Sequence, residues 1–146
     1  MNARYKLQKP NWWGYNIKIS NSASKANGKN KKTQSNMCGK LGGDASNVGK
    51  LKVGFCKLPS YIRGGPFWVV AHNEDEGYAL VSGGQPSIPT HDGCKHDEKK
   101  TSNSGLWIMT REQTRDVDLI KKVRDIATEK GLDVSVLDDV DQTSCK

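Results

Sequence analysis

The sequence has no long hydrophobic run, no Cys-x-x-Cys pair and almost no acidic residues in its first half. Its longest apolar run is Phe67–Ala71, so we expect no membrane-spanning helix, which needs about 20 apolar residues. No apolar segment follows Met1, and we expect any signal peptide to lie outside this chain. The absence of a Cys-x-x-Cys pair argues against a zinc ribbon and against a thioredoxin-type redox site.

Catalytic patterns are also missing. We find no Ser/His/Asp order around a nucleophile elbow, no glycine-rich phosphate loop before a helix, and no paired carboxylates on an expected inner face. A basic loop contains Lys25, Lys29, Lys31 and Lys32, but no aromatic residues alternate with these lysines to stack on bases. We therefore expect neither an enzyme nor a nucleic-acid-binding protein.

The charge is distributed unevenly along the 146 residues. The chain has 23 Lys and Arg against 16 Asp and Glu, a formal charge of +7, yet Asp44 is the only acid within residues 1–65. A basic face that meets nucleic acid, anionic lipid headgroups or an acidic protein is one interpretation. The other is that a basic half offsets an acidic one, and we favour it because the lysines are spread over strands and loops.

Four cysteines are present, and they allow three fully paired connectivities: Cys38, Cys56, Cys94 and Cys145. Cys145 is one residue from the C-terminus, where a disulfide would hold the tail to the body. Cys38 and Cys56 fall near opposed positions of one expected hairpin, so a cross-strand disulfide is a candidate. The even count and this placement predict an oxidising compartment, and hence a secreted or luminal protein.

Two polar segments carry groups that bind metals elsewhere. The loop His91–Glu98 holds imidazole, thiol and carboxylate groups that suit zinc, but their spacing matches no standard site. The acidic tip Glu74–Glu76 lacks the spacing of an EF-hand. We interpret the first as a disulfide-bonded surface loop and the second as a solvated turn, and we predict no metal site.

Alternation of apolar and polar residues predicts about seven antiparallel strands, over residues 2–8, 15–19, 37–41, 50–55, 67–71, 78–82 and 106–110. Residues 21–34 and 83–104 are expected to be loops. Apolar residues at three- and four-residue spacing then predict a helix over 114–130, capped by Thr114 and stopped by Gly131. A last strand is expected over Val134–Leu137. These elements predict one domain spanning 1–146, which is a barrel or a strongly curved sheet with a helix packed outside.

Several segments together resemble the lipocalin family, in the branch of apolipoprotein D and the bacterial lipocalins. They are Ala3–Leu7, Lys50–Phe55, Pro66–Val70, Tyr78–Val81, Leu106–Arg111, Gly131–Ser135 and Asp141–Cys145. The resemblance implies an eight-stranded up-and-down antiparallel β-barrel, with barrel strands over 2–111, one C-terminal helix packed outside, and a final strand and tail over 133–140. Family members hold one small apolar ligand in the barrel.

The resemblance also implies roles for individual residues. Five fall at ligand-lining positions, where the alternative is a plain core that fills a narrow barrel: Tyr5, Phe55, Phe67, Trp107 and Met109. Arg111 matches an arginine that closes the barrel base by packing over a tryptophan. The first strand that carries this tryptophan in a Gly-x-Trp motif does not precede Asn2, and the proline expected two residues after Arg111 is replaced by Gln113. We expect an N-terminal segment outside this chain, which would also carry the partner of the tail cysteine.

The sequence therefore predicts a protein that binds and transports a small hydrophobic molecule: a fatty acid, a sterol, a retinoid or carotenoid, or a tetrapyrrole. No cofactor is predicted beyond such a bound molecule. The alternative is a non-enzymatic interaction subunit that docks through its basic half on an acidic protein or a larger assembly. In that case another polypeptide, such as a disulfide-held N-terminal segment, supplies the first strand.

Overall fold

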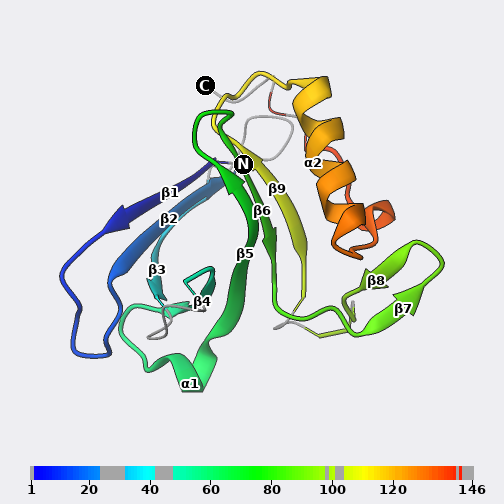
Figure 1. The fold of residues 1–146 in the computed structure, drawn as a ribbon. Helices are drawn as coiled ribbons and strands as arrows, with labels where there is room; N and C mark the ends of the chain where they lie inside the picture. The colour runs from blue at the N-terminus through cyan, green and yellow to red at the C-terminus, as the bar shows by residue number, and fades with distance from the viewer. Residues whose placement is uncertain are drawn as a thin grey trace. The chain divides into compact units, whose positions relative to one another are not determined.

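The computed structural model describes residues 2–23, 32–41, 48–97, 99–100, 104–140 and 142 (Figure 1). The chain divides into two compact units, one of Met1–Gly65 with Val140–Lys146 and one of Pro66–Asp139, here called unit 1 and unit 2. The fold is mainly β, with antiparallel strands and one long helix, as the sequence predicts. No helix in the described part of the chain has the length and apolar character needed to cross a membrane.

Unit 1 is an antiparallel meander. Its strands are β1 (Asn2–Leu7), β2 (Ile17–Ala23), β3 (Lys32–Lys40) and β4 (Lys50–Phe55), followed by the short helix α1 (Ser60–Arg63). The expected loop over 21–34 is wrong at both ends, because β2 runs on to Ala23 and β3 already begins at Lys32. Apart from Ala23 the paired residues there are polar, so backbone hydrogen bonds extend the hairpin where side-chain alternation gives no signal.

The two faces of this meander differ in chemistry. Residues paired across antiparallel strands share a face, and neighbours along a strand alternate between faces. One face is apolar, and Ile17 and Ile19 are buried on it. The other face is basic and carries six exposed cations: Arg4, Lys6, Lys18, Lys40, Lys50 and Lys52.

A disulfide joins Cys38 on β3 to Cys56, directly after β4, which confirms the predicted cross-strand candidate. Its S–S distance is 2.12 Å and its Cα atoms lie 4.9 Å apart. The side-chain amide of Asn11 donates to the Cys56 carbonyl at 2.9 Å. The β1–β2 connection, β3 and the segment after β4 are therefore tied together at Cys56.

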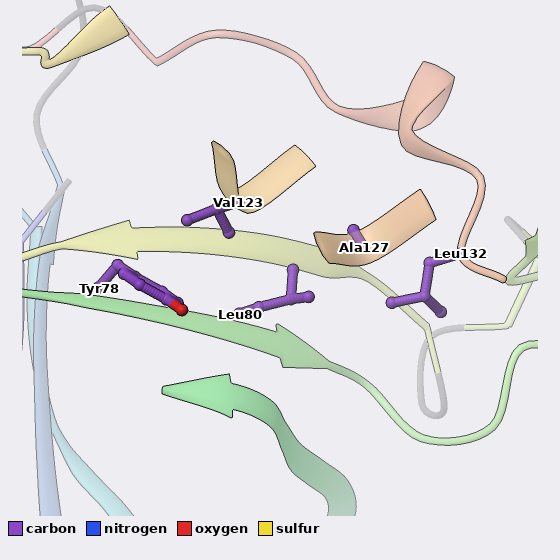
Figure 2. Close-up of a cluster of buried hydrophobic side chains, with 5 residues drawn as sticks. All are labelled: Tyr78, Leu80, Val123, Ala127 and Leu132. Atoms are coloured by element: carbon purple, nitrogen blue, oxygen red, sulfur yellow. The ribbon is translucent and has the colours of Figure 1, made fainter. Parts of the chain in front are cut away.

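Unit 2 contains β5 (Gly65–Asn73), β6 (Tyr78–Ser82) and β9 (Leu106–Thr110), paired antiparallel in that order, and the helix α2 (Val117–Glu129). The helix packs on one face of these strands. Figure 2 shows the buried cluster between them: Tyr78 and Leu80 from β6, Val123 and Ala127 from α2, and Leu132. A bulge between Val69 and Ala71 lets two consecutive β5 residues, Val70 and Ala71, pack toward this core.

The helix occupies the predicted region, but its cap is Asp116 rather than Thr114. The Asp116 carboxylate accepts a hydrogen bond from the Leu119 amide at 3.0 Å, and helical geometry begins at the next residue. Gly131, at φ +74°, ends the helix as expected. Aspartate is as good a cap as threonine, so sequence alone does not choose between two candidates two residues apart.

Two other expectations for unit 2 are wrong. The predicted loop 83–104 contains a short hairpin, β7 (Ile88–Thr90) with β8 (Gly93–Lys95), and the predicted strand Val134–Leu137 is a 3-10 turn, η2 (Val134–Val136). Backbone pairing with β8 occurs earlier, at Leu132, where the Cys94 amide donates to the Gly131 carbonyl and the Asp133 amide donates to the Cys94 carbonyl. The Asp133 side chain then caps the 3-10 turn through the Ser135 amide.

Candidate functional site

The face of unit 2 opposite α2 is apolar and carries three of the predicted ligand residues. The register pairs Trp107 with Val81 and Met109 with Ala79, so both β9 residues point away from the helix. Alternation places Phe67 on the same face as Val69, which pairs with Val81. The structure therefore brings Phe67, Trp107 and Met109 onto one face.

Phe67 and Trp107 contact each other directly. Their ring centroids are 6.4 Å apart and their planes differ by 20°, which is a stacked arrangement. Because β6 lies between β5 and β9, the two rings meet above β6, where Val81 is buried. Trp107 still exposes 39% of its surface, so a large aromatic side chain remains available to another molecule.

The other two predicted ligand residues, Tyr5 and Phe55, lie in unit 1 on the apolar face. They end a row that crosses four strands, in which Tyr5 pairs with Ile19, Ile19 with Met37, and Met37 with Phe55. Tyr5 is 46% and Phe55 is 42% exposed, whereas Ile19 between them is buried. Local burial raises the pKa of the Tyr5 phenol, so this group is a neutral hydrogen-bonding hydroxyl at ordinary pH.

Sequence reasoning missed one polar residue on this face. Asn21 follows Ile17 and Ile19 in the same alternation, and its side-chain oxygen is buried without a hydrogen-bond partner among the described residues. A buried acceptor without a donor costs free energy unless another group satisfies it. The signal was present, because Ile17, Ile19 and Asn21 continue one period-2 pattern into the segment expected to be a loop.

Ser82 and His96 form a close pair that also escaped prediction. Ser82 Oγ lies 2.9 Å from His96 Nε2, a distance at which a histidine activates a serine nucleophile in hydrolases. Here the serine is buried and donates its only proton to the Gly84 carbonyl at 2.6 Å. His96 Nε2 must therefore donate to Ser82, and the pair holds two chain segments together rather than preparing a nucleophile.

The groups in the loop His91–Glu98 are directed to different partners. His91 Nδ1 bonds to Asp92 at 2.8 Å on the surface, whereas His96 contacts Ser82. Cys94 has no disulfide partner among the described residues, and Cys145 and Glu98 lie outside them. Over the described ranges, no three His, Cys, Asp or Glu side chains gather in a way that could hold a metal ion.

Arg111 lies at the tip of the β5–β6 hairpin. Its amide donates to the Gly77 carbonyl at 2.8 Å, and its guanidinium is 3.6 Å from Glu74 Oε1, with both side chains largely exposed. Glu76 at the same tip pairs with Lys122 of α2, and this hydrogen bond raises the lysine pKa. The acidic tip is thus occupied by ion pairs to arginine and lysine.

Comparison of the chain with protein-family models and with curated protein sequences gave no match.

Proposed function

We propose that the protein binds and carries a small hydrophobic molecule on its apolar sheet faces. The observation that carries the proposal is the Phe67–Trp107 stack, which lies beside Met109 on the face that α2 does not cover. Stacked aromatic rings and a flexible thioether fit the surface of an apolar ligand of irregular shape. Fatty acids, sterols, retinoids, carotenoids and tetrapyrroles all belong to this ligand class.

The exposed aromatic surface is large enough to matter energetically. Removing about 330 Å² of apolar surface from water corresponds to about 8 kcal/mol, before the costs of association are subtracted. A ligand that covers Trp107, of which 39% is exposed, buries part of this area there and the remainder on neighbouring residues of the face and on its own surface.

Polar groups on the apolar face of unit 1 narrow the ligand class. The neutral hydroxyl of Tyr5 both donates and accepts, and the side-chain oxygen of Asn21 lacks a described donor. Tyr5 is 46% exposed, so its hydroxyl end is accessible to a ligand on this face. A polar hydroxyl there favours a fatty acid or a hydroxylated isoprenoid over a pure hydrocarbon.

The proposal includes the closed β-barrel that the resemblance to lipocalins implies. In the eight-stranded up-and-down barrel of lipocalins, one side-chain parity of every strand faces the interior. All five candidate ligand residues lie on the apolar side of their strands, as that architecture requires. The Cys38–Cys56 disulfide is compatible with a secreted or luminal carrier.

Titration of the full, unreduced chain with all-trans-retinol and with oleic acid tests the proposal, followed by protein fluorescence and native mass spectrometry. We expect a complex with one ligand, and a loss of affinity of at least about tenfold in Trp107→Ala and in Met109→Ala. Trp12→Ala is the matched control, because Trp12 is 91% exposed on the β1–β2 connection. Unchanged affinity in folded Trp107→Ala, or equal losses in all three variants, would refute the assignment of this face.

A further inference from the structure

Unit 1 exposes large apolar side chains on two connecting segments. The β1–β2 connection carries Trp12, 91% exposed, and the segment after β4 carries Tyr61, 84% exposed, together with Ile62. Leu58 and Trp13 in the same two segments are also exposed. Solvent-exposed aromatic residues concentrated in this way are typical of surfaces that meet a partner or a membrane.

A rigid frame holds the two segments together. Asn11 donates to the Cys56 carbonyl, and its Oδ1 accepts from the amides of Trp13 and Tyr15 at 3.0 and 3.1 Å. Cys56 is itself fixed to the buried Cys38 by the disulfide. The backbone that presents Trp12 is therefore held by hydrogen bonds to a residue that a covalent bond fixes, and Tyr61 follows that residue, Cys56, on the next helix, α1.

The exposed apolar segments adjoin the basic face. Cys38 lies on that face, in the row where Lys6 pairs with Lys18 and Lys18 with Cys38. On the other side, Lys40 reaches the β1–β2 connection, since a β-carbon on Gly14 would lie 3.3 Å from Lys40 Nζ. The basic face therefore adjoins the segment that carries Trp12 and Trp13.

The register of the basic face places like charges opposite one another. Lys6 lies directly opposite Lys18, and Lys40 directly opposite Lys52, which are like-charge pairs that destabilise a sheet. None of these four lysines makes an ion pair with a residue that the structure describes, and residues 1–65 contain a single acid, Asp44. An external anionic surface would supply the missing counter-charge.

We propose that unit 1 docks on an anionic lipid surface, with its lysines among the headgroups and Trp12, Tyr61 and Ile62 at the boundary between headgroups and acyl chains. Tryptophan and tyrosine prefer that boundary because one end of the ring system is apolar and the other is polar. Lysines reach the headgroups with their ammonium groups while their stems cover apolar surface. This docking does not depend on the proposed ligand binding.

Two other partners fit the same surface less well. The centre of a protein–protein interface is depleted in lysine, whereas this face consists of cations and small residues. Single-stranded nucleic acid is held by aromatic side chains interleaved with cations, and no aromatic residue shares the parity of the lysines on β1–β4. A lipid bilayer offers a surface of anionic headgroups, which matches the basic face of unit 1. Its adjacent apolar layer matches the exposed apolar side chains of the two connecting segments.

Cosedimentation of the full, unreduced chain with vesicles tests the proposal. We expect binding to phosphatidylcholine vesicles containing about 30 mol% phosphatidylserine, weak binding to pure phosphatidylcholine, and about a tenfold loss of binding at high salt. Tryptophan emission should shift to shorter wavelength on binding. Equal binding to both vesicle types, or binding to polyglutamate or a single-stranded oligonucleotide but not to vesicles, would overturn the proposal.

Lys18→Glu is the sharpest variant, because it converts the Lys6–Lys18 repulsion into an attraction and so favours folding while it removes charge from the face. We expect its vesicle binding to fall about tenfold. Lys100→Glu makes the same change of charge on an exposed lysine of unit 2 and should bind nearly as wild type does. If the two variants bind equally, net charge rather than the basic face is responsible and the proposal fails.

Trp12→Ala separates docking from ligand binding. This variant should lose vesicle binding and the fluorescence shift while it retains affinity for retinol, and Trp107→Ala should show the opposite behaviour. A Trp12→Ala chain that still binds anionic vesicles as the wild type does would refute the placement of this side chain at the boundary.

Discussion

The indole of Trp107 occupies the space that a β-carbon on Gly105 would need: such a carbon would lie 2.3 Å from Cζ2 of the ring. Gly105 also adopts φ +105°, a conformation that other residues rarely adopt. The absence of a side chain at Gly105 therefore leaves the space that the indole needs to stack on Phe67.

Gly105→Ala should displace the Trp107 ring and weaken retinol binding nearly as much as Trp107→Ala does, at a cost in stability of about 1–3 kcal/mol. Near-ultraviolet circular dichroism, urea unfolding and ligand titration measure the three effects. Gly131→Ala is the control, because Gly131 also has a positive φ but nothing lies within 4 Å of its β-carbon position. If Gly131→Ala weakens ligand binding to the same extent, backbone strain rather than the indole position explains the loss.

Tyr15→Phe should stabilise the protein. Tyr15 is fully buried, its hydroxyl has no hydrogen-bond partner among the described residues, and burial raises its pKa. Removing a buried, unpaired hydroxyl should add about 1 kcal/mol to the free energy of unfolding, measured with urea near neutral pH. A loss of stability would show instead that water or a segment outside the described residues satisfies the hydroxyl.

Asp133 should make stability depend on pH in the acidic range. Hydrogen bonds from Ser135, first, and from Thr90 lower the pKa of its carboxyl below the ordinary value of 3.8. The folded state therefore binds the proton less well than the unfolded state, so the stabilisation is present above pH 4 and is lost as the pH falls through the folded-state pKa.

In Asp133→Asn the loss of stability that protonation of the Asp133 carboxylate causes should be absent, because an amide does not titrate. Thermal unfolding between about pH 2 and 7 measures it. An Asp133→Asn profile that coincides with wild type would contradict the assignment.

Reduction of the Cys38–Cys56 disulfide should destabilise unit 1 by about 3 kcal/mol, given the 18-residue separation in sequence. Unfolding with and without a reductant measures this, and the double variant Cys38→Ala/Cys56→Ala should behave like the reduced protein. Cys94→Ser is the control, because Cys94 is not in this disulfide and should respond to reductant as wild type does. Insensitivity of the wild type to reductant would contradict the structure at Cys56.

Much of the fold could be predicted from the sequence, because most strands bury one face. Alternation located β1, β4, β6 and β9, and helical spacing located α2. It failed at β7 and β8, where three-residue strands are too short to show a period, and at the polar ends of β2 and β3.

The candidate site was predictable as a set of residues but not as an arrangement. The row from Tyr5 to Phe55 depends on the register of three hairpins, including an irregularity between Ile19 and Asn21 that nothing in the sequence announces. The same limit applies to charge. Lysines that look dispersed along the chain are gathered by register onto one face, so Lys6 and Lys18 become neighbours.

The bulge in β5 has a consequence for how this protein can change. In a regular strand every second residue faces the core. Inserting or deleting one residue therefore turns all the residues beyond that point to the opposite face of the sheet. In β5 the core position is set by Val70 and Ala71 together, and Phe67 lies on the N-terminal side of the irregularity. Substitutions before the bulge can therefore alter the face that carries Phe67, where we propose that the ligand binds, without repacking the helix.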